Sequence, residues 1–105
     1  MLLGLLPAAL DELEAAVLWH EAERPGHGAL LVDEVRKRVA QAARLPKSGA
    51  PIAGLDPGHD VRAYPTSRFP YRVITAVVRG TPMVIAVAHA RRAPEYWRDR
   101  LSSAD

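Results

Sequence analysis

Residues 68–98 read RFPYRVITAVVRGTPMVIAVAHARRAPEYWR, and this stretch decides the fold. It contains two apolar runs rich in β-branched residues, 73–78 and 83–88, which the sequence Arg-Gly-Thr-Pro separates. β-Branched residues favour strands, and glycine and proline mark the turn between them. The pattern therefore predicts a β-hairpin. A burst of cationic and aromatic side chains follows the second run directly, which indicates a site for a phosphate-rich partner.

Two amphipathic helices are predicted before this hairpin, over residues 8–24 and 28–45. In the first helix, Leu10, Leu13, Val17 and His20 fall on one face at spacings of three and four. In the second, an apolar stripe is formed by Leu31, Val32, Val35, Val39 and Ala42. The Pro-Gly-His-Gly break between the helices predicts an antiparallel αα-hairpin. Such a hairpin needs a flat apolar surface to cover, and the later strands supply one.

The remaining segments complete an α+β fold. Residues 1–6 predict a short edge strand, residues 46–60 a loop, and residues 61–64 a short strand. Residues 94–101 are helical by composition. The predicted order is β-α-α-β-β-β-α: an N-terminal helical hairpin on a small, mainly antiparallel sheet, then a short C-terminal helix, as a single domain over residues 1–105. Six residues are predicted to be among the most buried: Leu31, Val35, Val39, Val73, Ile85 and Val87.

Composition and charge restrict the classes of function. The chain has no cysteine, which excludes a disulfide frame or a thiolate site. Its longest apolar segment near the start is too short to cross a bilayer, so we expect a soluble, cytoplasmic protein. Residues 1–35 carry seven acidic residues against one arginine, a net charge of −6, and residues 36–105 carry 13 basic residues against five acidic ones, a net charge of +8. This separation of sign indicates an acidic N-terminal half and a basic C-terminal half.

Four local patterns follow one another over residues 10–101. They are Trp19 with Arg24-Pro25-Gly26-His27-Gly28 and Glu34-Val35, then Val61-Arg62, then Arg68-Phe69-Pro70-Tyr71-Arg72, and last Val87-Ala88-His89-Ala90-Arg91-Arg92 with Pro94, Tyr96, Trp97 and Arg98. Together, in this order, they resemble the RelE/ParE superfamily, the small bacterial toxins of type II toxin–antitoxin systems that were once called plasmid stabilisation proteins. The chain departs from the family at His20, where relatives commonly carry a tyrosine, and at Ala90, where glycine is frequent.

The resemblance implies a toxin that inhibits growth and is neutralised by a cognate antitoxin protein, with which it forms a hetero-oligomer. It leaves two targets open. Some members are ribosome-dependent messenger RNA endoribonucleases, whereas others inhibit DNA gyrase without cleaving anything. The residues of the site must decide between them, because one fold supports both actions.

Cleavage of RNA through its own 2′-hydroxyl needs a base, an acid and cations that stabilise the phosphorane. His89 is the natural proton carrier, and Tyr96 is a poor base unless neighbouring arginines lower its pKa. Arginine supplies a planar fork for phosphate. The predicted catalytic residues are Arg68, His89, Arg91 and Tyr96. The predicted residues for binding nucleic acid or another target are Arg62, Arg72, Arg92 and Arg98.

Structural roles compete with each of these assignments. His89 ends a strand and can simply bond to neighbouring backbone, and Tyr96 can be a core aromatic whose hydroxyl reaches solvent. Trp97 is expected to pack. Arg98 or Arg100 can pair with a nearby acid or with the acidic first helix. No metal or other cofactor is expected, because the four histidines lie far apart without carboxylates at ligand spacing. The endoribonuclease and the gyrase inhibitor therefore stay equally open.

Overall fold

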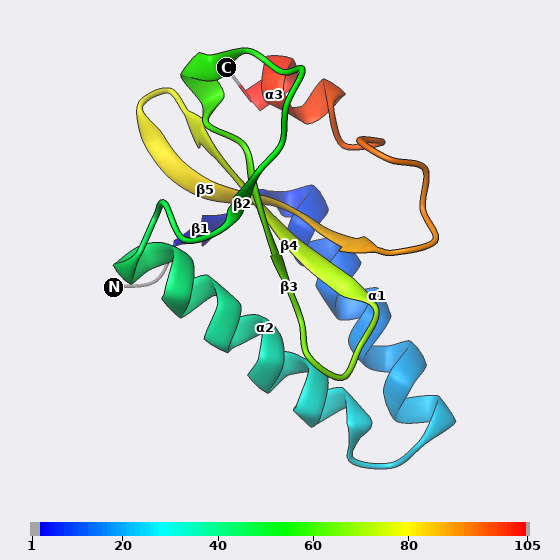
Figure 1. Ribbon diagram of the computed structural model, residues 1–105. Helices are drawn as coiled ribbons and strands as arrows, with labels where there is room; N and C mark the ends of the chain where they lie inside the picture. The colour runs from blue at the N-terminus through cyan, green and yellow to red at the C-terminus, as the bar shows by residue number, and fades with distance from the viewer. Residues whose placement is uncertain (1–2, 105) are drawn as a thin grey trace.

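The computed structural model describes residues 3–104, which form a helical hairpin on a five-stranded sheet (Figure 1). Helix α1 spans Pro7–Glu23 and begins at Pro7, whose fixed φ suits the first helical position. It ends before Pro25, and Gly26, at φ 91°, turns the chain into α2, His27–Arg44. Both predicted helices are therefore confirmed, with bounds shifted by one residue at each end.

The sheet has the strand order β1-β5-β4-β3-β2. The bounds are Gly4–Leu5 for β1, Ala50–Pro51 for β2, Arg62–Pro65 for β3, Tyr71–Val78 for β4 and Thr81–His89 for β5. Only β1 runs parallel to its neighbour, and the other three pairs are antiparallel. Strands β4 and β5 form the predicted hairpin, joined by Arg79 and Gly80, which both have positive φ, as two-residue hairpin turns require.

Each face of the sheet is covered by a different layer. Helices α1 and α2 pack on the face that carries Tyr64 and Val73, which are register partners. The opposite face carries Ala63 and Ile74, and it is covered by the loop after β2 and by the C-terminal segment with α3, Asp99–Ala104. In Figure 1 that loop and α3 lie at the end of the molecule away from the α1–α2 turn. All six residues predicted as core are at most 5% exposed.

Four sequence-based expectations differ from the structure or extend beyond the described residues. Residues 46–60 hold the two-residue strand β2 and a 3₁₀ helix, Pro57–His59, so the sheet has one more strand than predicted. Residues 94–98 form turns instead of helix, because Glu95 has φ 58° and cannot continue a right-handed helix. The first strand is only Gly4–Leu5, and Met1 and Leu2 lie outside the described residues.

The inward face of α1 also differs from the prediction. Leu10 is 45% exposed, whereas Ala9 and Ala16 are fully buried against the sheet and Leu13 and Val17 are half-buried. Small alanine side chains let α1 approach β5 closely, and the larger Leu10 turns outward.

Within residues 3–104, no helix combines the length and apolarity that a bilayer crossing requires.

Candidate functional site

A hollow of about 270 Å³ lies between α1, the end of β5 and the segment that follows β5. Three residues predicted for the site, His89, Arg92 and Tyr96, line it together. The complete lining is Glu12, Ala15, Ala16, Trp19, Tyr71, Val87, His89, Arg92 and Tyr96. The lining thus combines apolar, aromatic and charged side chains.

Glu12 joins the elements around the hollow. Its carboxylate accepts the Val87 backbone N–H at 3.0 Å, the Tyr96 hydroxyl at 2.5 Å, and two bonds from Arg100 at 2.9 and 3.0 Å. Burial would raise the pKa of this carboxyl, but the hydrogen bonds from Arg100, Tyr96 and Val87 together lower it below the ordinary glutamate value. Glu12 is therefore ionised and fully engaged. The pairing of Arg100 with the acidic first helix is the structural alternative that the sequence offered.

Glu12 and Arg100 also complete the hydrogen bonding at the edge of the sheet. Strand β1 reaches along β5 only as far as Val84, whose carbonyl accepts the Leu6 N–H. Beyond that point the Ile85 carbonyl accepts Arg100 Nη1 at 2.9 Å, and the Val87 N–H donates to Glu12. Two side chains thus satisfy the backbone groups that a longer β1 would have paired.

Tyr96 is held in its protonated form. Burial first, and then the hydrogen bond to Glu12, raise the pKa of its phenol to about 12, although Arg92 and Arg100 act in the opposite direction. The Arg92 guanidinium lies over the Tyr96 ring, 3.7 Å from its centroid. The arginines expected to lower the pKa of Tyr96 are present, but they do not outweigh the carboxylate. Tyr96 therefore cannot act as a base near neutral pH.

His89 bonds to the adjacent backbone, as its structural alternative proposed. The Arg91 backbone N–H donates to His89 Nδ1 at 2.9 Å, so the neutral ring carries its hydrogen on Nε2. The ring packs edge-on against Tyr71, with centroids 5.1 Å apart. On the far side of Tyr71, His20 Nε2 lies 3.1 Å from the hydroxyl oxygen. Burial, together with His27 and His89, lowers the pKa of His20, so this imidazole is neutral at pH 7.

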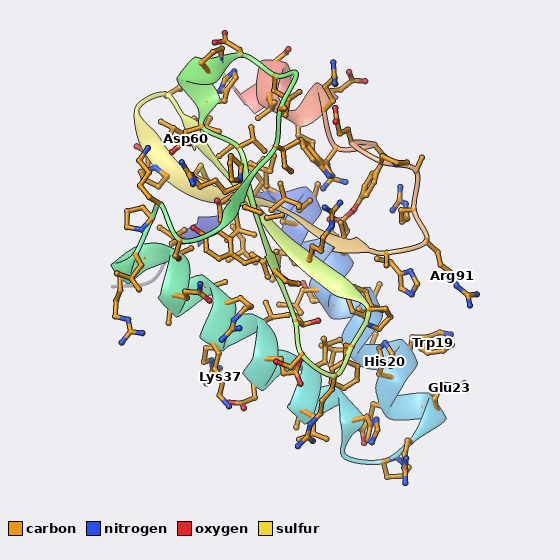
Figure 2. The ribbon with its side chains drawn as sticks, in the orientation of Figure 1. Trp19, His20, Glu23, Lys37, Asp60 and Arg91 are labelled. Carbon is orange, nitrogen blue, oxygen red and sulfur yellow. The ribbon has the colours of Figure 1, made fainter. Side chains whose placement is uncertain are left out.

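The other predicted catalytic residues lie outside the hollow. Arg68 lines a separate cavity of about 220 Å³ beside α2, where Glu34 accepts the backbone N–H groups of Ser67 and Arg68. Arg91 is exposed, and Figure 2 shows it extending outward from the segment after β5. The predicted cluster of four is therefore divided, with His89 and Tyr96 in one hollow and the two arginines elsewhere.

The predicted binding arginines have different surroundings. Arg62 bonds to Asp60 and to the carbonyls of Lys47 and Gly49, and it thereby holds the loop before β3. Arg98 pairs with Glu95. Arg72 is half-buried and follows Tyr71 on β4. Neighbouring side chains of a strand point to opposite faces, so Arg72 lies on the sheet face opposite α1 and α2. Only Arg92 lines the hollow.

Sequence reasoning did not assign Glu12, Trp19 or Tyr71 to the site. Trp19 is 59% exposed and projects from α1, as Figure 2 shows. The one available signal was the separation of charge, which predicts contact between an acidic helix and a basic C-terminal segment.

Among residues 3–104, no group of three histidine, cysteine, aspartate or glutamate side chains gathers as a metal site would require.

Comparisons with protein-family models, with curated proteins and with solved structures found no match to this chain.

Proposed function

We propose that this chain is the toxin of a type II toxin–antitoxin system, acts in the cytoplasm and inhibits growth by binding its target instead of cleaving RNA. Support for the first part comes from the resemblance to RelE/ParE toxins. Its motifs lie, in order, on the helical hairpin, at the start of β3, and on the β4–β5 hairpin with the segments that flank it. For members that act by binding alone, the resemblance implies DNA gyrase as the target.

One observation carries the choice of binding over cleavage: the hollow presents proton donors, and its carboxylate, Glu12, is already bonded to Arg100, Tyr96 and the Val87 N–H. A general base must accept a proton near neutral pH. His89 Nδ1 already accepts the Arg91 N–H, which leaves the Nε2–H of the neutral ring as a donor. Tyr96 keeps its proton up to about pH 12, and Arg92 is a permanent cation. Such a set recognises negative charge, whereas it cannot remove a proton from a 2′-hydroxyl.

An antitoxin that neutralises this chain is expected to be acidic, with apolar residues. The basic C-terminal half supplies the complementary charge, and Arg91, Arg92 and Arg98 are all exposed. Opposite charges should make association fast and sensitive to salt. Purification from the native operon should therefore recover a hetero-oligomer with a second small protein. Isolation of this chain alone under gentle, low-salt conditions would argue against the module.

The endoribonuclease is the second candidate, and a specific observation favours it. His89, Arg92 and Tyr96 converge on one hollow, and catalytic hydrogen bonds often reach their final geometry only when substrate binds. Cleavage would then require the Arg91 N–H bond to His89 to break, so that the imidazole could exchange a proton.

The deciding experiment separates the two targets in the same cells. The full chain is expressed from a tight inducible promoter, alone and with the neighbouring gene, while translation and gyrase-dependent DNA damage are followed in parallel. We expect growth arrest that the neighbouring gene relieves, DNA damage before any loss of translation, and inhibition of supercoiling by the purified protein. Immediate messenger RNA cleavage without DNA damage would replace the binding mode with the nuclease. Unimpaired growth would contradict the toxin assignment itself.

A further inference from the structure

Helix α1 carries apolar residues on both of its faces. The inner face packs against the sheet through small and aliphatic side chains. On the outer face four exposed residues follow the spacing i, i+3, i+4 and i+7, which places side chains on one side of a helix. We call these four the outer stripe: Ala15, Leu18, Trp19 and Ala22. Leu18 is 72% exposed and Trp19 is 59% exposed, so the stripe presents two large apolar side chains to its surroundings.

The neighbouring helix has no such stripe along its middle. There the exposed residues of α2 are Asp33, Arg36 and Lys37, and Asp33 pairs with Lys37 at 3.1 Å. Both helices cover the same face of the sheet, so both would carry polar outer faces if each met only water. A helix that is apolar all round is ordinarily covered on all sides. The outer stripe of α1 therefore indicates an interaction surface.

Three carboxylates border the outer stripe, and their charge is not neutralised. Asp11, Glu14 and Glu23 are exposed, and each stands four residues from a member of the stripe, one helical turn away. In Figure 2 Trp19 and Glu23 lie on the same side of α1. Among residues 3–104, none of the three carboxylates forms a hydrogen bond or an ion pair. A partner without cations would cover the stripe at the cost of desolvating this charge.

The same charge disfavours a second copy of this chain on the outer stripe. Pairing α1 with the α1 of a second copy would bring three carboxylates from each helix to one contact. Like charges across an interface are costly, and they suppress the wrong partner. An acidic partner is disfavoured for the same reason, and the basic C-terminal half offers such a partner a better surface. The complementary occupant is therefore basic.

We propose that the outer face of α1 binds an amphipathic helix of another protein, apolar at i, i+3, i+4 and i+7 and flanked by lysine or arginine. The apolar residues of that helix would pack on Leu18 and Trp19, and its cations would reach Asp11, Glu14 and Glu23. Helix α1 has 17 residues and is about 25 Å long, enough for several turns of a partner helix. The inference goes beyond the proposed function, because it concerns a second surface and a partner of opposite charge to the acidic antitoxin.

The test is a titration of the full chain into labelled helical peptides of about 18 residues, followed by fluorescence anisotropy. The first peptide has leucine at i, i+3, i+4 and i+7 and lysine on both flanks. The second has glutamate in place of every lysine, and the third has the composition of the first in scrambled order. We expect the lysine peptide to bind, with an affinity that falls as salt rises, and the other two to bind at least roughly 10-fold more weakly.

Variants then locate the binding surface. Leu18→Ser should weaken binding of the lysine peptide roughly 10-fold and Trp19→Ala roughly 30-fold, the latter being the ~2 kcal/mol of an interface hot spot. Leu18 does not line the hollow, so its variant reports on the outer stripe alone. The matched control is Leu45→Ser, because Leu45 is 56% exposed at the end of α2 and lies outside the stripe. This control should bind as the parent does.

A charge reversal tests the choice of partner. The double variant Glu14→Lys, Glu23→Lys should lose the lysine peptide and gain the glutamate peptide, and a thermal melt checks that it is folded. Three results would overturn the proposal: no binding of the lysine peptide, equal binding of the lysine and glutamate peptides by the parent, or equal losses in Leu18→Ser and Leu45→Ser. So would a dimer in sedimentation equilibrium that Leu18→Ser dissociates, because a second copy would then be the occupant. None of these results depends on toxicity, so failure here is distinct from failure of the toxin assignment.

Discussion

Glu12 on α1 and Arg100 on α3 form a two-point ion pair across 88 residues of sequence, with oxygen–nitrogen distances of 2.9 and 3.0 Å. The two partners are only 15% and 22% exposed, so solvent screens their attraction weakly. The pair also bonds to β5 on both sides of Ala86, through Ile85 and Val87. It therefore attaches the C-terminal segment to α1 and to the sheet at once.

Glu12→Gln should destabilise the fold by about 1–3 kcal/mol. The substitution leaves Arg100 without a counter-charge in a mostly buried position, and breaking a fully buried pair costs about 3–5 kcal/mol. Partial exposure reduces that figure. Urea denaturation measures the loss, with Glu14→Gln as the control, because Glu14 is exposed on the same helix. Equal stability of the two variants would show that the ion pair contributes nothing net.

The contribution of Glu12 should disappear in acid. Its pKa is lowered in the folded state, so the unfolded chain binds more protons in the window between the two pKa values, and stability rises with pH there. The stabilisation is fully present above the ordinary glutamate pKa of about 4.3 and is lost as pH falls through the lowered value. The measurement is the difference in unfolding free energy between parent and Glu12→Gln from neutral pH to pH 3. A difference that grows on acidification would contradict the assignment.

Tyr96 should ionise well above the ordinary tyrosine pKa. The phenolate absorbance of the parent should contain a component near pH 12 that Tyr96→Phe removes. In Glu12→Gln that component should move to lower pH, because the carboxylate that opposes phenolate formation is gone. Since this pKa is raised on folding, its stabilising contribution is present below about pH 10, the ordinary tyrosine value, and is lost as pH rises through 12.

Under the proposed binding function, toxicity should survive Tyr96→Phe. Its hydroxyl bonds to Glu12, so a binding surface loses little when that hydroxyl is removed. Arg91→Ala should weaken inhibition by only a few-fold, because one exposed contact is removed. Growth curves beside thermal melts separate loss of action from loss of folding. Complete loss of toxicity in a folded Tyr96→Phe protein would instead support nuclease chemistry, in which losing a transition-state contact costs on the order of 100-fold or more in rate.

Trp97→Phe should cost little for so buried a residue. The indole Nε1 is buried and has no hydrogen-bond partner among the described residues, so phenylalanine sacrifices no bond. We expect Trp97→Phe to lower the free energy of unfolding by about 1–2 kcal/mol. Trp97→Ala should lower it by about 3–5 kcal/mol, because it opens a large cavity between the sheet and α3. Equal losses in the two variants, measured by urea denaturation, would indicate that the indole N–H is in fact bonded.

The parts of the fold that sequence predicted well carry long apolar patterns. Helix α2 repeats its apolar spacing along its length, β4 and β5 are apolar runs at least eight residues long, and the core positions Leu31, Val73 and Ile85 follow from these patterns. Strand β2 is two residues long and includes Pro51, so it has no period to detect. The start of α3 was placed too early because composition alone does not reveal the positive φ of Glu95.

The site was less predictable because its chemistry is set by contacts between distant residues. His89 and Arg92 were assigned from their position just after an apolar run, a local feature. The pKa of Tyr96 depends on Glu12, 84 residues earlier in the chain, and no local pattern joins the two. Charge separation indicated that the acidic helix and the basic segment would meet. It did not indicate that one carboxylate would bind a phenol, a guanidinium and a strand edge together.

The position of Arg100 has a consequence for biosynthesis. Chains emerge from the ribosome N-terminus first, at about 5–20 residues per second, and α1 is complete long before Arg100 is made. Until then β5 lacks the donor for the Ile85 carbonyl, Glu12 lacks its cation, and the wall of the hollow formed by Arg92 and Tyr96 is not anchored. A nascent chain therefore cannot present the finished surface while most of it is still being translated. Under the proposed function, an antitoxin already present would have this interval in which to meet the chain before its surface is complete.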